Sequence, residues 1–329
     1  MSCLEKGRAF GHRVYLSGIP WTMRKGLAIR AAAALLVLLF LLYAAPRVGE
    51  GAGESFYVKN RQLKSPEYVG TITLYHVVSC KTYQGSVTAF LQERAEAFNR
   101  RHFGVRIVVE GMGEADFLER LSYGRRADMY SFFSGALYEE LLQAAAFDPG
   151  TDLREGLFIT DYAAPWCFSG YVKAEAGVTA PVAALANGAE GTVMDLRAWG
   201  DVQRAGEVME DAAAAGPFTD QVCYLGVDRN TAAEKAGWCL SFYGFLVEEP
   251  TQRMLTSLGA FSVRTDVPCP YGNALLLDLD RAYTRVTVPD PFLYHTHRTK
   301  LLEEATAALA GDEAAKNSFF QRLAIVIGG

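Results

Sequence analysis

The sequence has few of the residues from which metal and catalytic sites are built. Its 329 residues include only 5 histidines and 6 cysteines, with no Cys-x-x-Cys pair and no histidine at zinc-like spacing from a cysteine. It also lacks Gly-x-Ser-x-Gly, His-Glu-x-x-His and a phosphate-binding glycine-rich loop ending in Lys-Ser/Thr. These absences disfavour a structural zinc site and the common hydrolase and nucleotide chemistries. We expect a binding protein with no catalytic residues, no metal and no cofactor.

Positive charge is concentrated at the N-terminus. Residues 1–30 carry six Lys or Arg against one Glu, a net charge of +5 in a chain of net charge −5, so the remainder carries −10. An acidic body argues against nucleic acid as a partner, since phosphates would repel it. With 50% hydrophobic and 21% charged residues, the composition predicts a globular protein of one large domain or two lobes.

One long apolar run follows the basic segment. Residues 31–45 (AAAALLVLLFLLYAA) are long for the core of a signal peptide and short for a spanning helix. The preceding cations predict a cytoplasmic N-terminus and a body on the extracytoplasmic side of the cell membrane. Cleavage after Ala45 would leave the bulky Tyr43 at the −3 position, so we favour an uncleaved anchor. A signal cleaved there or before Ala52, and a buried hairpin helix, are the alternatives.

The body begins after a polar linker at residues 46–69. Its first part alternates strands and helices, with strands predicted at 71–78, 105–109 and 127–133 and helices at 87–102, 114–123 and 137–146. Alternation at this spacing predicts a doubly wound α/β lobe with a mainly parallel sheet.

The second half of the body is less regular. Strands are predicted at 166–173 and 218–227, and helices at 194–209, from Thr231, from Pro250 to Gly259, at 296–310 and at 313–326. Thr231 and Glu234 fit a capping box at the start of one helix. The stretch 174–219 is rich in Ala and Gly and has no clear periodicity.

Several segments together carry a family resemblance. They include TITLYHVV with the polar turn SCKTYQG, the helix end AFNRRH, VRIVVEGMG, RRADMYSFFSG, DYAAPWCFSGYVKA and, most specifically, TQRMLTSLGAFSVRTDV. In these segments residues 70–329 resemble the extracellular solute-binding proteins of ABC importers, in the sugar-binding, maltose-binding-protein-like branch. The resemblance implies a two-lobed, periplasmic-binding-protein-like α/β fold with doubly wound, mainly parallel sheets.

The resemblance also implies how the chain divides. Lobe 1 would comprise residues 70–160 and 227–272, and lobe 2 residues 161–226 and 273–329. The hinge would lie at chain crossings near 160–166, 223–228 and 270–275. Fewer than sixty residues separate Trp166 from Tyr224, so lobe 2 would be abbreviated.

The implied function is capture of a small ligand, with a carbohydrate favoured. A monomeric protein would close its hinge over the ligand and deliver it to permease subunits in the membrane. Ligands of such folds bind at the carboxyl ends of parallel strands, where aromatic faces supply apolar area. The positions that match are Lys81, Tyr83, Phe133, Ser134, Trp166, Tyr171, Tyr224 and Tyr294. For Phe133 and Trp166, a core position is the slightly stronger interpretation.

The histidines give weak signals. His76 lies inside an apolar strand, where a core role is more common than ligand contact. His295 and His297 would face the same way only in a strand, since in a helix their side chains diverge by about 200°. We therefore expect no metal site there.

The sequence leaves two alternative functions and the pairing of the cysteines open. A degenerate binding-protein fold would act as a membrane-tethered interaction or sensory module without a transport ligand, and a cleft filled by side chains would favour it. An enzyme on a similar scaffold would need ionisable groups with perturbed titration in the cleft. The body has five cysteines, so at least one thiol stays free if all pairing is internal, and the spacing does not identify pairs.

Overall fold

The structure is a computed structural model that describes residues 32, 34–35, 68–78, 80–174, 180–189, 192–206, 212–267 and 271–328. The chain forms two compact units, residues 1–65 and 66–329. In the first unit only Ala32, Ala34 and Leu35 are described, as exposed helical residues. The predicted basic segment and nearly all of the predicted anchor and linker lie outside the described residues. Among those described, no helix has both the length and the apolar character needed to cross a bilayer.

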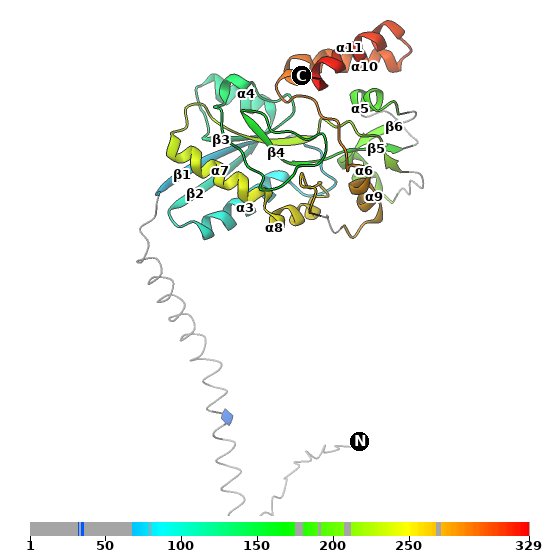
Figure 1. The fold of residues 1–329 in the computed structure, drawn as a ribbon. Coiled ribbons are helices and arrows are strands. Elements are labelled where there is room, and N and C mark those ends of the chain that lie inside the picture. Colours follow the sequence, from blue (N-terminus) through cyan, green and yellow to red (C-terminus); the bar gives the residue numbers. More distant parts are fainter. Residues whose placement is uncertain are drawn as a thin grey trace, which may run out of the picture. The chain divides into compact units, whose positions relative to one another are not determined.

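The second unit is built on a five-stranded sheet with the order β2-β1-β3-β8-β4 (Figure 1). Its strands are β1 (Gly70–Val77), β2 (Val105–Met112), β3 (Met129–Phe133), β4 (Ala163–Phe168) and β8 (Val222–Val227). β1 runs parallel to both β2 and β3, whereas β8 runs antiparallel to β3 and β4. The sheet is therefore mixed, with β8 as the one reversed strand.

Helices cover both faces of this sheet, as the alternating pattern predicts. α3 (Val87–Arg101) joins β1 to β2, and α4 (Glu114–Ser122) joins β2 to β3. From α3, Phe90 stacks on Trp166 of β4, with ring centroids 6.2 Å apart. From α4, Phe117 meets Tyr130 of β3 edge-on at 5.7 Å. Side chains of a strand alternate between faces, and Tyr130 adjoins Ser131, which accepts a hydrogen bond from Trp166. The two helices thus pack on opposite faces.

A smaller sheet has the order β6-β5-β7 and is entirely antiparallel. Its strands are β5 (Tyr171–Ala174), β6 (Thr192–Asp195) and β7 (Ala213–Ala214), and the helices near it are α5 (Pro181–Ala186), α6 (Leu196–Arg204) and α9 (Ala274–Ala282). The expectation of mainly parallel sheets is wrong for this part. The helices α5 and α6 connect the strands of this sheet, but both β6 and β7 pair with β5 in the antiparallel direction.

β4 and β8 belong to the large sheet, although the sequence boundaries at 161 and 226 assign them to the second lobe. The chain passes directly from Phe168 in β4 to Tyr171 in β5. It returns through residues 215–221 into β8. The small sheet is therefore an insertion between β4 and β8, and the crossing lies at 169–170 instead of 160–166.

Helices complete the second unit. α7 (Ala233–Val247), α8 (Glu249–Arg253) and the 3₁₀ turn η3 (Met254–Ser257) follow β8. The chain closes with α10 (Leu293–Leu309) and α11 (Glu313–Ile327), which confirms the two predicted terminal helices. α10 packs against both α11 and α5, and Figure 1 shows this hairpin in orange and red.

Two local predictions are wrong. Residues 137–146 form only the 3₁₀ turn η2 (Glu139–Leu141), because Gln143 donates its backbone N–H to the Val227 carbonyl and holds the chain extended beside the sheet. The capping box is absent as well. α7 begins after Ala232 without a side-chain cap, and the Thr231 hydroxyl instead donates to the Asp128 carbonyl at 2.9 Å.

His76 is a core residue, with 1% of its surface exposed. Its Nδ1 atom lies 3.0 Å from the Ser131 hydroxyl, and within the described residues its Nε2 atom has no hydrogen-bond partner. Burial lowers the pKa of His76 from 6.5 to about 4. The imidazole is consequently neutral in the folded chain at neutral pH.

This pKa predicts a pH-dependent stability. The unfolded chain binds a proton at His76 below about pH 6.5, whereas the folded chain binds it only near pH 4. The contribution of His76 is therefore fully present above pH 6.5, and it is lost between pH 6.5 and 4, by up to about 1.4 kcal/mol per pH unit. In urea unfolding at a series of pH values, His76→Asn should lose less stability than the wild type across this window. His297→Gln, which changes a half-buried histidine in α10, should follow the wild type, and an unchanged slope in His76→Asn would contradict the assignment.

Candidate functional site

A pocket of about 470 Å³ opens where the large sheet meets the small one. Its walls come from the turn after β1, the end of β3, β5, α5, the end of β6, the segment before β8, and α10. β1 and β3 are parallel, so their carboxyl ends reach the same edge of the sheet, where ligands of open α/β folds bind. The lining residues are Lys81, Phe133, Tyr171, Ala180, Pro181, Val182, Ala183, Asp195, Asp220, Gln221, Tyr294, Arg298, Thr299 and Leu302.

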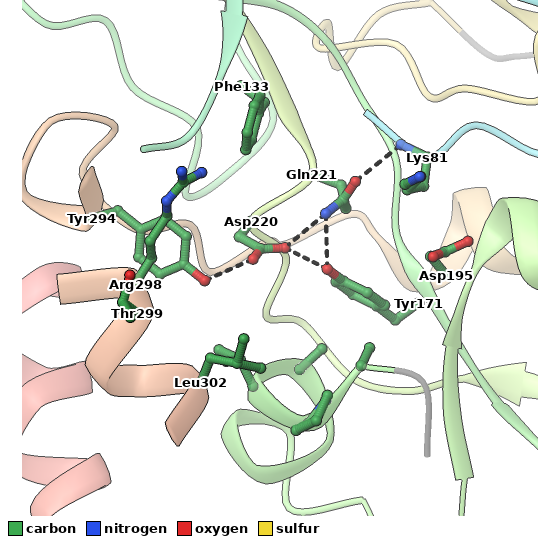
Figure 2. Close-up of a pocket in the computed structure, with 14 residues that line it drawn as sticks. Lys81, Phe133, Tyr171, Asp195, Asp220, Gln221, Tyr294, Arg298, Thr299 and Leu302 are labelled. Atoms are coloured by element: carbon green, nitrogen blue, oxygen red, sulfur yellow. Dashed lines mark hydrogen bonds between the residues drawn. The ribbon is translucent and has the colours of Figure 1, made fainter. Parts of the chain in front are cut away.

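Asp220 is the centre of the hydrogen bonds in this pocket (Figure 2). Its Oδ2 atom accepts from the Tyr294 hydroxyl at 2.7 Å, and its Oδ1 atom accepts from the Tyr171 hydroxyl. The side-chain amide of Gln221 donates to the same Oδ1 at 3.1 Å and to the Tyr171 hydroxyl oxygen at 3.0 Å. The Gln221 Oε1 atom accepts the Lys81 backbone N–H at 2.9 Å. The network thus joins the turn after β1, β5, the segment before β8, and α10.

Both tyrosines act as neutral hydrogen-bond donors. Tyr171 and Tyr294 are 5% and 4% exposed. Burial, followed by the negative charge of Asp220, raises the pKa of each hydroxyl well above its ordinary value. Protonated phenols beside a carboxylate fix its orientation and leave it free to accept further hydrogen bonds from a ligand.

Cations and an aromatic face complete the lining of the pocket. The Arg298 guanidinium of α10 lies over the Phe133 ring, 5.7 Å from its centroid, and pairs with Glu114 of α4. Lys81 lines the pocket from the turn after β1. Asp195 is occupied as the N-cap of α6, where it accepts the Ala198 N–H at 2.8 Å. The pocket therefore has charges of both signs around a partly apolar wall.

Four of the eight predicted ligand residues line this pocket together, and four lie elsewhere. Lys81, Phe133, Tyr171 and Tyr294 are in the lining, and ligand contact by them stays a prediction. Ser134, Trp166 and Tyr224 have no exposed surface, and Tyr83 packs against α6.

The three buried residues belong to the core of the large sheet. Trp166 stacks on Phe90 and donates to the Ser131 hydroxyl at 3.2 Å, and Tyr224 stacks on Phe132. Large aromatics in strands that are covered on both faces are held by packing, which leaves them no face for a ligand.

Sequence reasoning missed the polar residues that organise the pocket. Asp220 and Gln221 were included in a predicted strand, but β8 begins only at Val222. The signal in the sequence is the polar pair Asp220 and Gln221, which stands immediately before the apolar residues of β8. Arg298 lies in a predicted helix, and nothing in the sequence places that helix beside β3.

The histidine pair lies in α10, so its two rings diverge. His295 contacts the Gly135 carbonyl at 2.6 Å through Nδ1, whereas His297 lies 3.4 Å from an Arg322 guanidinium nitrogen. Within the described ranges, no cluster of three His, Cys, Asp or Glu side chains is placed to hold a metal ion.

Tyr83 forms a second connection between the two sheets. Its ring lies 5.1 Å from Trp199 of α6, and its carbonyl accepts from the Arg204 guanidinium at 3.4 Å. Gly200 faces that same carbonyl, and a Cβ added there would lie 2.6 Å from the Tyr83 oxygen. Gly259 packs on the Tyr83 side chain just as closely. Tyr83 is therefore a packing residue between α6 and the turn after η3.

Comparisons with known proteins show which solved structures share this architecture. No protein-family model and no curated protein matches the sequence. Among solved structures, the cyclic α-maltosyl-1,6-maltose binding protein from Arthrobacter globiformis superposes with a TM-score of 0.54, 13% identity, and coverage of 79% of this chain and 99% of that one. The chain has the fold of the extracellular solute-binding proteins.

Two further solved structures have the same fold. An extracellular solute-binding protein from Staphylococcus aureus in complex with maltose has a TM-score of 0.53 at 9% identity, and covers 79% of this chain and 96% of its own. A maltose/maltodextrin-binding domain from Bdellovibrio bacteriovorus bound to maltotriose has a TM-score of 0.51 at 10% identity, and covers 77% and 100%. The resemblance seen in the sequence is thereby confirmed for the fold, and identities this low establish the fold alone.

The close contact at Gly200 predicts opposite effects for two helical glycines. Gly200→Ala should lower stability by about 1 to 3 kcal/mol, because the new methyl group collides with the Tyr83 backbone and α6 must shift. Gly237→Ala in α7 has nothing within 4 Å of its added Cβ, and should be neutral or stabilising by up to about 1 kcal/mol. Thermal unfolding of both variants measures the difference. Equal, small effects would show that α6 and Tyr83 are not in contact.

Proposed function

We propose that this chain captures a small polar ligand, with a carbohydrate favoured, as the extracytoplasmic binding component of an ABC-type importer. The observation that carries the proposal is the pocket in which Asp220 is held by Tyr171, Tyr294 and Gln221. It offers a preorientated carboxylate, an amide and a lysine beside an aromatic ring. Such a combination suits a polyhydroxylated ligand, whose hydroxyls donate and accept while its ring faces stack.

The charges around the pocket support a neutral ligand. Asp220 and Asp195 stand against Lys81 and Arg298, and two of these four are already engaged, since Asp195 caps α6 and Arg298 pairs with Glu114. A site for a strongly anionic or cationic ligand would have charge of one sign in excess. The hydroxyl groups of a carbohydrate are uncharged, so they can bind beside charges of both signs.

The open pocket also favours ligand binding over the two alternative functions, an interaction module and an enzyme. A binding-protein fold that had become an interaction module would have a cleft filled by side chains, whereas this one retains about 470 Å³. An enzyme would need ionisable groups with perturbed titration in the cleft. The pKa values of Tyr171 and Tyr294 are raised, but burial and the charge of Asp220 account for both shifts, and both hydroxyls are engaged as donors to that carboxylate. Ligand binding without chemistry is therefore the function that the geometry favours.

The mechanism that we propose is hinge closure. The small sheet is attached through residues 169–170 and 215–221, and ligand contacts from both sheets would stabilise the closed form. Closure would present a surface to permease subunits in the membrane. The body would be monomeric and would stand outside the cytoplasm, tethered through residues 31–45. The basic flank and apolar run of the N-terminus support this location.

A thermal-unfolding screen of the purified chain against sugars, amino acids, peptides, anions and metal ions tests this function. A ligand that binds the folded chain alone raises the midpoint, by about 2.7 kcal/mol of stability at a hundredfold excess over Kd. We expect at least one sugar to raise it.

Two variants then localise the ligand. Asp220→Asn and Tyr294→Phe should abolish the shift. The first replaces one of the two acceptor oxygens by a donor and removes the charge, and the second removes the hydroxyl that donates to Asp220. Tyr123→Phe, an exposed tyrosine remote from the lining, should keep it. No shift across the library would overturn the proposed function, and a shift that survives Asp220→Asn would place the ligand elsewhere.

A further inference from the structure

Three buried cysteines lie beside residues of the pocket lining: Cys80 precedes Lys81, Cys223 follows Gln221 by two positions, and Cys167 is opposed to Cys223. Cys80 lies in the turn after β1, Cys167 in β4 and Cys223 in β8, and their exposed fractions are 9%, 0% and 1%. Cys167 and Cys223 are opposed across the two strands, and the Cys80 thiol donates to the carbonyl of Gln221, two residues before Cys223. All three are free thiols in this structure. Nothing in the proposed ligand-binding role uses these thiols.

Cys167 and Cys223 have the backbone relation that a disulfide requires. β4 and β8 are antiparallel neighbours, and the register places these two residues directly opposite each other. Opposed residues of antiparallel strands have Cα atoms about 4.5 to 5.5 Å apart, within the range of about 4.4 to 6.8 Å found for disulfides. The register shifts between Pro165 and Cys167, immediately before this pair, and Cys167 and Cys223 remain opposite each other. The backbone separation expected of an opposed pair therefore suits a disulfide.

We infer that Cys167 and Cys223 form a structural disulfide in the mature protein. The two Sγ atoms bond to each other, and each thiol gives up one proton and one electron. A disulfide oxidant, such as oxidised glutathione or a thiol–disulfide oxidoreductase, accepts the two electrons and two protons and leaves as two thiols. The inference rests on the extracytoplasmic location proposed above, because disulfides persist in oxidising compartments.

Cys80 is the third thiol of the cluster and stays reduced. It lies in a turn instead of a neighbouring strand, and its thiol also donates to the Gln221 carbonyl at 3.6 Å. Burial raises the pKa of the Cys167 thiol, so the thiolate that attacks an oxidant is scarce once the chain has folded.

The disulfide acts on the part of the chain that carries the small sheet. Residues 168–222 contain β5, α5, β6, α6 and β7, and the two cysteines stand at the two ends of this insertion. A bond between them closes its base and restricts the unfolded chain, which stabilises the fold. It also anchors the strand that begins just after Asp220 and Gln221.

The pairing can be read directly from the full chain. The chain is refolded in a glutathione redox buffer, its free thiols are blocked with N-ethylmaleimide in denaturant, and it is digested with trypsin without reduction. Each cysteine falls in a separate tryptic peptide, so a linked pair is unambiguous: 1–6, 65–81, 155–173, 205–229, 236–253 and 265–281. We expect peptide 155–173 linked to 205–229. Blocked thiols in both peptides, or 205–229 linked to 65–81 or 265–281, would overturn the inference.

Reductant sensitivity provides an independent readout. Reduction should lower the Tm by roughly 5 to 10 °C in the wild type, in Cys80→Ala and in Cys239→Ala, whose thiol is equally buried in α7. Cys167→Ala and Cys223→Ala should show no such shift, and a shift retained in either would overturn the inference. If a variant fails to fold, the peptide map of the wild type decides. Neither measurement uses a ligand, so a failed ligand screen would leave both results unchanged.

Discussion

The carboxylate of Asp220 is the group on which the arrangement of the pocket depends. It accepts hydrogen bonds from Tyr171 on β5 and from Tyr294 on α10, two elements more than a hundred residues apart in the chain. A half-buried carboxylate costs free energy unless donors surround it, and the two phenols with Gln221 supply them. The same contacts that satisfy the charge therefore hold the small sheet, α10 and the start of β8 around one cavity.

The second constraint is close packing beside the pocket. Tyr83 fits between α6 and the turn at Gly259, and glycine at positions 200 and 259 is what lets the backbones approach. Together with the Arg298–Glu114 ion pair, which joins α10 to α4, this gives the small sheet and the terminal hairpin attachment on two sides. These contacts fix how α6 and α10 pack beside the pocket.

The thiol cluster and the pocket meet in one strand. β8 is the reversed strand of the large sheet, and the segment that enters it carries Asp220 and Gln221 before Cys223 begins its contacts with the neighbouring strand. This part of the chain thus carries both residues of the pocket lining and the cysteine that is opposed to Cys167. The sequence alone predicts only an apolar strand here. It does not indicate which strands pair with β8, nor which residues face Asp220 and Cys223.

The sequence by itself determined the alternation of strands and helices over residues 70–133, the terminal helices and the family of fold. These follow from periodicity and from local motifs, which act over a few residues. Only the tertiary structure decided that β8 runs antiparallel, that Trp166 and Tyr224 are core, and that Asp220 meets Tyr294. Such contacts depend on strand order and on which face each side chain takes, and a one-residue change of register reverses that face. Local pattern carries no information about partners so distant in the chain.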